Sequence, residues 1–177
     1  MQISKLEVKN ISYYERGSEE TPCYNATVYL NGKKAIEVSN DGRGGMDFQH
    51  QYNLGDNGIV KEANEWCIKK FGTKTIAYKS EGKDKSFSVN MDLEHVCQDA
   101  LYDWLDKKTL KKDMVKRWLI SEDNQLHQYK KLPILPPHTK EGMENHFKVF
   151  LNKNHPKAKC LNFMTFEEAL KIYKELG

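Results

Sequence analysis

The first third of the chain alternates between apolar and polar residues, which is the period of a β-strand with one buried face. A first strand is predicted over residues 2–14, with a bend at Asn10. Alternation returns over residues 24–30 and again over 33–39. Between these runs, Asn31-Gly32 favours a two-residue hairpin turn, because both turn positions need a positive φ. We therefore expect an antiparallel meander of about three strands here.

Helical periodicity replaces alternation further along the chain. Apolar residues recur every three or four positions over 57–71 and, without a miss, over 93–105. A separate basic helical piece is expected through 110–115. Two more helices are predicted near the C-terminus, one ended by Asn154-His155-Pro156 and one that starts at the capping-box pattern Thr165-x-x-Glu168.

The segments between these helices are expected to hold further strands. Residues 73–78 and 86–91 could each be a strand, with a solvated loop over 80–85. Apolar runs on both sides of a polar turn predict a second hairpin near 118–130. The whole pattern is that of an α+β protein, in which N-terminal antiparallel strands pack against several amphipathic helices.

Three prolines mark the best candidate for a connector between domains. Pro133, Pro136 and Pro137 each fix φ and remove a backbone donor, which favours an extended segment. We expect a main α+β domain over 1–132, a proline-rich connector over 133–137, and a C-terminal helical segment over 138–177 that packs on the main domain.

Composition and charge narrow the class of protein. Hydrophobic residues make up 38% of the chain and charged residues 30%, so a modest core with a well-solvated surface is expected. The four cysteines include no Cys-x-x-Cys pair, which argues against a zinc site or a disulfide framework and favours reduced thiols. With no apolar run of about 18 residues and no apolar N-terminal segment, we expect a cytoplasmic protein with no membrane-spanning helix.

The segment Asn40-Asp41-Gly42-Arg43-Gly44-Gly45 is the leading candidate for a site. Three glycines within four positions permit positive φ and a close approach of backbone to a neighbour. Exposed amides in such a turn can hold an anion, and Arg43 could bind a phosphate or a carboxylate. The alternative is a bulge or crossover against the chain's own backbone. Neither the P-loop nor the dinucleotide motif is present. The expected contact residues are Asp41, Gly42, Arg43, Gly44 and Gly45.

A lysine-rich region over 107–131 offers a second candidate, a nucleic-acid interface. Basic residues recur there at about helical spacing beside an aromatic side chain, so that phosphate contact and base stacking are both conceivable. The alternative is an ordinary solvated face, and the net charge of +3 is too balanced to decide. The residues of this candidate are Lys107, Lys108, Lys111, Lys112, Lys116, Arg117 and Trp118.

Signals of catalysis are weak. The sequence contains no Gly-x-Ser-x-Gly, no His-Glu-x-x-His and no cysteine with a nucleophile signature. A metal- or nucleotide-dependent enzyme would have to use Asp41, Asp47 and His50, whose spacing matches no metal-site pattern; solvated loop carboxylates are the simpler interpretation. No catalytic residue, cofactor or metal is assigned.

Two patterns together resemble small accessory proteins of phages and bacterial mobile elements. The first is the order strand, Asn-Gly turn, strand, Asn-Asp-Gly-x-Gly-Gly, and the second is Leu161-Asn162 followed by Phe166-Glu167-Glu168-Ala169-Leu170. The resemblance implies a context in the host cytoplasm, where such proteins often act by binding, for instance by blocking a component of host defence. We therefore expect a non-enzymatic, anti-defence binding protein that engages a host protein or a phosphate-bearing ligand.

Overall fold

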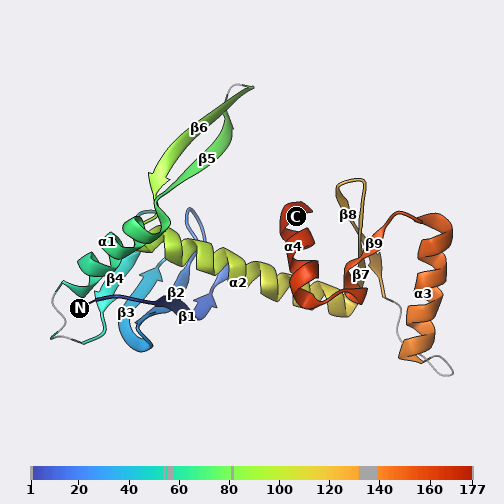
Figure 1. Cartoon of the computed structure of the whole chain (residues 1–177), viewed down its shortest axis with the longest axis horizontal. Helices are drawn as coiled ribbons and strands as arrows, with labels where there is room; N and C mark the ends of the chain where they lie inside the picture. The colour runs from blue at the N-terminus through green and yellow to red at the C-terminus, as the bar shows by residue number, and fades with distance from the viewer. Residues whose placement is uncertain (1, 54, 56–57, 81, 132–138, 177) are drawn as a thin grey trace. The chain divides into compact units, whose positions relative to one another are not determined.

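A computed structural model describes residues 2–53, 55, 58–80, 82–131 and 139–176. It confirms the α+β class, with helices and antiparallel sheets (Figure 1). Its contacts divide the chain into two compact units, Met1–Asp103 and Trp104–Gly177. None of the described helices combines the length and the apolar character that crossing a membrane requires.

The first unit is built on a four-stranded antiparallel sheet in the order β1-β2-β3-β4. Its strands are β1 (Leu6–Tyr13), β2 (Tyr24–Leu30), β3 (Lys33–Asn40) and β4 (Phe48–Gln51), and a short 3-10 turn, η1 (Glu15–Gly17), follows β1. The predicted bend is confirmed, because Asn10 has φ 54° and the β1–β2 register shifts beside it. The predicted turn is confirmed too, with φ 50° at Asn31 and 81° at Gly32.

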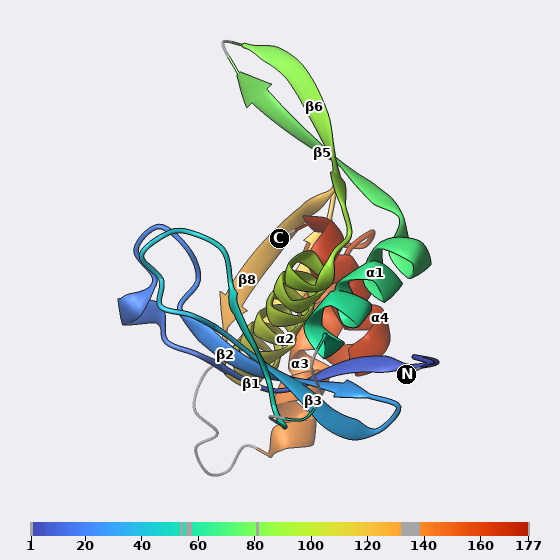
Figure 2. The same cartoon turned by 90° about the vertical axis from the view of Figure 1, so that its left-hand side faces the viewer.

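Two helices lie on one face of this sheet, as Figures 1 and 2 show: α1 (Ile59–Phe71) and the first part of α2 (Leu93–Lys116). The strands turn alternate apolar side chains inward, among them the fully buried Val28 and Ile36. Each helix contributes its apolar stripe, including Ala63 of α1 and Leu101 of α2. Asn64 joins the helices by accepting a hydrogen bond from the Leu93 amide at 3.0 Å. The other face of the sheet carries polar side chains.

Two elements differ from the sequence-based expectations. Residues 80–85 are largely strand, because β5 (Thr73–Ser80) and β6 (Lys83–Asn90) pair along their whole length as a two-stranded ribbon. The basic piece through 110–115 is no separate helix, since α2 runs unbroken from Leu93 to Lys116. Nothing in the sequence interrupts helical backbone near residue 106, so the change from apolar to basic character does not end the helix.

The second unit packs helices on a small sheet of order β8-β7-β9. Its elements are β7 (Arg117–Glu122), β8 (Gln125–Lys130), α3 (Lys140–Asn154), β9 (Lys159–Cys160), η2 (Leu161–Phe163) and α4 (Phe166–Leu176). The second hairpin is thus confirmed. So is the capping box: the Glu168 carboxylate accepts the Thr165 amide at 3.1 Å, and the Thr165 hydroxyl accepts the Glu168 amide at 3.3 Å.

The compact units divide the chain at a different place from the proline-rich segment. One core cluster joins the second hairpin to α3 through Trp118, Ile120, Phe147 and Leu151, so residues of the expected main domain pack with the C-terminal helices. The boundary between the units falls inside α2. The connector expected over 133–137 lies outside the described residues.

Candidate functional site

The glycine loop between β3 and β4 is anchored through one carbonyl group. The Gly42 oxygen accepts backbone hydrogen bonds from Glu19 and Glu20, both at 2.9 Å, and from Thr21 at 3.3 Å. These three residues belong to the connection between β1 and β2. The loop is therefore tied to a segment about twenty residues earlier in the chain.

Gly42 is the position where a glycine is required. It has φ 86°, it is buried, and a Cβ atom placed on it would overlap the carbonyl oxygen of Gly17. The close backbone approach suggested by the sequence thus exists, and at Gly42 the neighbour is the chain itself. Gly44 and Gly45 also have positive φ, but Gly44 faces the Glu20 side chain and nothing lies within contact of a Cβ at Gly45.

A network of buried polar side chains supports the loop. The Asn40 side-chain oxygen accepts from the Thr21 hydroxyl at 2.7 Å and from the Gly42 amide at 2.9 Å. The Asn40 amide group donates to the Asp47 carboxylate at 3.0 Å, and the Tyr24 hydroxyl donates to the same carboxylate. Asn40 and Asp47 are buried, and these bonds offset the cost of removing them from water.

Burial in the first unit favours the neutral forms of Tyr24, Cys97 and Cys67. Burial raises the pKa of Tyr24, and the Asp47 carboxylate raises it further. Burial likewise raises the pKa of the Cys97 thiol, with Asp47 again adding to it, and it raises the pKa of Cys67 to about 11. A thiolate is the reactive form of cysteine, so neither thiol is prepared for nucleophilic attack.

Several residues of the loop itself are exposed. Asp41, Arg43 and Gly45 face solvent, and the Asp41 carboxylate accepts the Arg43 amide at 3.2 Å. Two apolar side chains follow at once: Met46 is 80% exposed and Phe48 57%. Sequence reasoning did not assign these two residues, because a single apolar residue next to a turn carries no periodic signal of exposure.

The three residues of the proposed metal or nucleotide site lie in different environments. Asp47 is buried and bonded to Tyr24, whereas Asp41 is exposed on the loop and His50 is exposed on β4. The His50 ring lies parallel to that of Phe48, with 6.5 Å between centroids. Within the described parts of the chain, no group of three His, Cys, Asp or Glu side chains is arranged to hold a metal ion.

The lysine-rich candidate is exposed, but its aromatic member is not. Lys107, Lys108, Lys111, Lys112 and Lys116 lie on the surface of α2. Trp118 is only 7% exposed, with its ring stacked on Phe147 at 4.6 Å between centroids, so it is not available for stacking on a base. Arg117 pairs with Asp113 at 3.5 Å and donates to Gln128.

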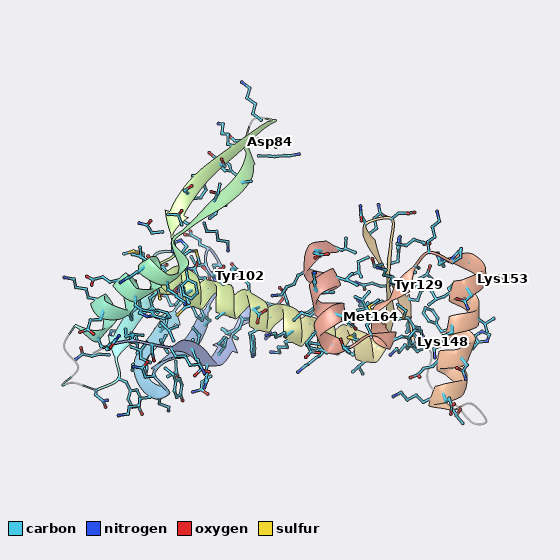
Figure 3. The ribbon with its side chains drawn as sticks, in the orientation of Figure 1. Asp84, Tyr102, Tyr129, Lys148, Lys153 and Met164 are labelled. Carbon is cyan, nitrogen blue, oxygen red and sulfur yellow. The ribbon has the colours of Figure 1, made fainter. Side chains whose placement is uncertain are left out.

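The second unit contains one acid–base arrangement that the sequence did not indicate. The His155 Nδ1 atom lies 2.6 Å from a Glu122 carboxylate oxygen, and its Nε2 atom lies 2.9 Å from the Tyr129 hydroxyl. The Tyr129 ring also packs against Phe147 and Phe150, in the region of β8 and α3 where Figure 3 labels it. Three residues separated by 7 to 33 positions meet here, and no spacing pattern could reveal that.

Comparisons with protein-family models, with curated proteins and with solved structures found no match to this chain.

Proposed function

We propose that this chain is a non-enzymatic binding protein that contacts a partner protein through the exposed side of the glycine loop. The contact surface comprises Asp41, Arg43 and Gly45, extended by Met46 and Phe48. One observation carries the proposal: the Gly42 carbonyl fixes the loop to the connection between β1 and β2, while Asp41, Arg43 and Gly45 are exposed to solvent. A loop held by a rigid scaffold is a common way to present binding residues.

The chemistry of the loop favours a protein over a phosphate-bearing ligand. An anion nest needs amides that are free to donate, but those of Gly42, Arg43 and Gly44 already donate to Asn40, Asp41 and Thr21. The Asp41 carboxylate beside Arg43 also opposes an anion. Methionine, aromatic residues and arginine are enriched in protein interfaces, and Met46, Phe48 and Arg43 supply one of each kind.

The resemblance to phage and mobile-element accessory proteins supports a host protein as the partner. The raised thiol pKa values and the structural use of Asp47 support binding rather than catalysis. A small factor that occupies a surface of a host defence component needs an exposed, preorganised contact and no reaction centre.

The test begins with a photo-crosslinking residue at position 46, which identifies the partner in host lysate by mass spectrometry. Affinity for that partner is then titrated for Arg43→Ala and Met46→Ala, with Lys33→Ala as a control on an exposed cation at the other end of β3. We expect losses of roughly tenfold or more for the loop variants, as for interface anchors, and none for the control. Thermal stability should change by no more than about 0.5 kcal/mol. Unchanged affinity in both loop variants would contradict the proposal.

Nucleic-acid binding by α2 is the second candidate. The exposed lysines of α2 between residues 107 and 116 are the observation that supports it. Lys108 and Lys112 are exposed on the same helix. The candidate predicts that Lys108→Gln with Lys112→Gln weakens binding to duplex DNA and makes its salt dependence shallower by about 1.8 in log–log slope. A wild-type chain that gives no mobility shift at low salt would remove this candidate.

A further inference from the structure

The β5–β6 ribbon is the most exposed regular element of the first unit. The ribbon extends away from the helices of its unit (Figure 2), and most of its described side chains are exposed on both faces. An isolated two-stranded ribbon is marginally stable in water, so a bound molecule that covers one of its faces would stabilise it. At its base, Lys74 donates to the Asp99 carboxylate of α2 at 2.8 and 3.1 Å, which ties the ribbon to its unit.

The strand register separates the ribbon into two unlike faces. Directly opposed residues share a face, so one face holds the pairs Lys74–Val89, Ile76–Phe87, Tyr78–Lys85 and Ser80–Lys83. This first set is the aromatic face. The polar face holds Thr75–Ser88, Ala77–Ser86 and Lys79–Asp84. Figure 3 labels Asp84 near the tip, and this acid belongs to the polar face.

The aromatic face combines exposed rings with positive charge. Tyr78 is 46% exposed and Phe87 50%, and their rings meet edge to face with 5.8 Å between centroids. Among the paired residues of this face there are three lysines and no acidic residue. Lys74 is already paired with Asp99, whereas Lys85 donates to the Ser80 hydroxyl at 3.3 Å.

This combination identifies the occupant by elimination. A second copy of the chain, laid face to face, would bring lysines against lysines, and four apolar side chains fall short of the area a stable dimer buries. An acidic peptide would match the charge but would leave the two rings without flat partners. A single-stranded nucleic acid supplies phosphates for the lysines and unstacked bases for the rings.

We propose that the aromatic face of the β5–β6 ribbon binds single-stranded nucleic acid. The bases stack on Tyr78 and Phe87, and Lys83 and Lys85 contact the phosphates. Duplex is disfavoured because its bases already stack on one another and offer the rings no free face. The inference concerns a different surface and a different ligand from the proposed protein contact at Arg43, and it stands without that contact.

The experiment measures fluorescence anisotropy of a labelled oligothymidylate of about 12 nucleotides, within the range of single-strand site sizes. The full chain is titrated at low salt and again at rising salt. We expect Tyr78→Ala and Phe87→Ala to weaken binding by about 5-fold to 140-fold each, the range for loss of one stacked base. Lys83→Gln combined with Lys85→Gln should make the log–log salt slope shallower by about 1.4, the value for two phosphates on a single strand.

Matched controls separate the ribbon from the other surfaces. Lys79→Gln removes a lysine from the polar face, and Tyr102→Ala removes an exposed tyrosine from α2. Both should bind like the wild type apart from a small charge effect of Lys79. Tyr78→Phe keeps the ring and should also bind like the wild type, which guards against a misfolded ribbon as the cause of a loss. Arg43→Ala should leave oligothymidylate binding unchanged, so this test and that of the partner contact fail separately.

Four results would overturn the inference. The first is that the chain does not bind the oligonucleotide at low salt, and the second is that it binds a labelled duplex or a polyglutamate of equal charge as tightly as the single strand. The third is that Lys79→Gln and Lys85→Gln, each made alone, lose the same affinity. The fourth is that affinity falls only in the variant that combines Lys108→Gln with Lys112→Gln. The last result would assign the binding to α2.

Discussion

The glycine loop and the β5–β6 ribbon show how poorly local sequence pattern reports exposure. The loop has the residues of a flexible, open turn, yet Gly42 is buried and bonded on its carbonyl oxygen three times. The ribbon has regular backbone and apolar side chains, yet it buries little of either face. In the loop, the conformational freedom of Gly42 lets the chain pack against its own backbone. In the ribbon, regular strand pairing leaves two faces exposed to solvent. The comparison predicts that substitutions in the loop's support reduce stability, whereas substitutions in the ribbon reduce binding.

Gly42→Ala should give the largest effect. The added methyl group meets the Gly17 carbonyl, and alanine disfavours φ 86°, so a loss of about 3 kcal/mol or more in the free energy of unfolding is expected. Gly45→Ala is the matched control: it has a similar φ but open space, and it should cost about 1 to 2 kcal/mol. Urea denaturation measures both. Equal losses would mean that the contact with Gly17 adds nothing.

Tyr24→Phe should give the next largest effect. It removes the hydroxyl that donates to the buried Asp47 carboxylate and leaves that acceptor with one partner fewer. Hydrogen bonds to charged groups contribute about 2 kcal/mol, so a loss of that size in the free energy of unfolding is expected. Tyr14→Phe, at an exposed tyrosine, should stay within about 0.5 kcal/mol. A Tyr24→Phe protein as stable as the wild type would mean that the network does not support the loop.

The Glu94 carboxylate accepts a hydrogen bond from the Asp47 amide at 3.3 Å, so Glu94→Gln tests the same network through pH. Burial raises the pKa of Glu94, and the Asp47 and Asp92 carboxylates raise it further. The folded protein thus holds the proton of the Glu94 carboxyl group more tightly than the unfolded chain, in which glutamates titrate at about pH 4.3. The contribution of Glu94 to stability is present below that pH and is lost as pH rises through the raised folded pKa.

We therefore expect Glu94→Gln to stabilise the protein at pH 7 relative to the wild type and to lose that advantage near pH 4. The effect should be smaller than that of Tyr24→Phe, because Glu94 is only partly buried. Thermal unfolding of both proteins across this pH range measures it. A constant difference between them at all pH values would argue against titration of Glu94 as the cause.

Phe87→Ala should give the smallest change in stability. Half of this residue is exposed, and its ring meets that of Tyr78 edge to face, so the free energy of unfolding should fall by no more than about 0.5 kcal/mol. Ile36→Ala in β3, which is fully buried, should cost about 2 to 5 kcal/mol. If the two costs were similar, the ribbon would be part of the core in solution and its aromatic face would not be open.

Local sequence chemistry accounts for the elements that were predicted well. The Asn31-Gly32 turn and the Thr165–Glu168 box each depend on neighbouring residues, and both formed as expected. The sequence did not predict that α2 is continuous or that the ribbon extends to Ser80 and Lys83, because charged residues are compatible with strand, helix or loop. Burial was the weaker inference throughout: Trp118 is in the core and Met46 is on the surface, and only packing between distant segments decides either.

The candidate contacts were predictable only in part. Arg43 and the lysines of α2 are exposed, as surface charges usually are. The role of Gly42, however, depends on Glu19, Glu20 and Thr21, which approach it only after β1, β2 and β3 have paired. Glu122, Tyr129 and His155 likewise meet through the fold alone.

The three hydrogen bonds at the Gly42 oxygen also limit which residues of this region can be replaced without loss of the loop structure. The connection between β1 and β2 is bonded to the loop between β3 and β4 through four residues: Thr21, Asn40, Gly42 and Asp47. A homologue with the same architecture should therefore retain these residues even if its ligand differs. The Arg43 side chain carries no such constraint, so the proposed function predicts that this position varies among homologues. A search motif built on Thr21, Asn40, Gly42 and Asp47 should therefore recover proteins that share this architecture.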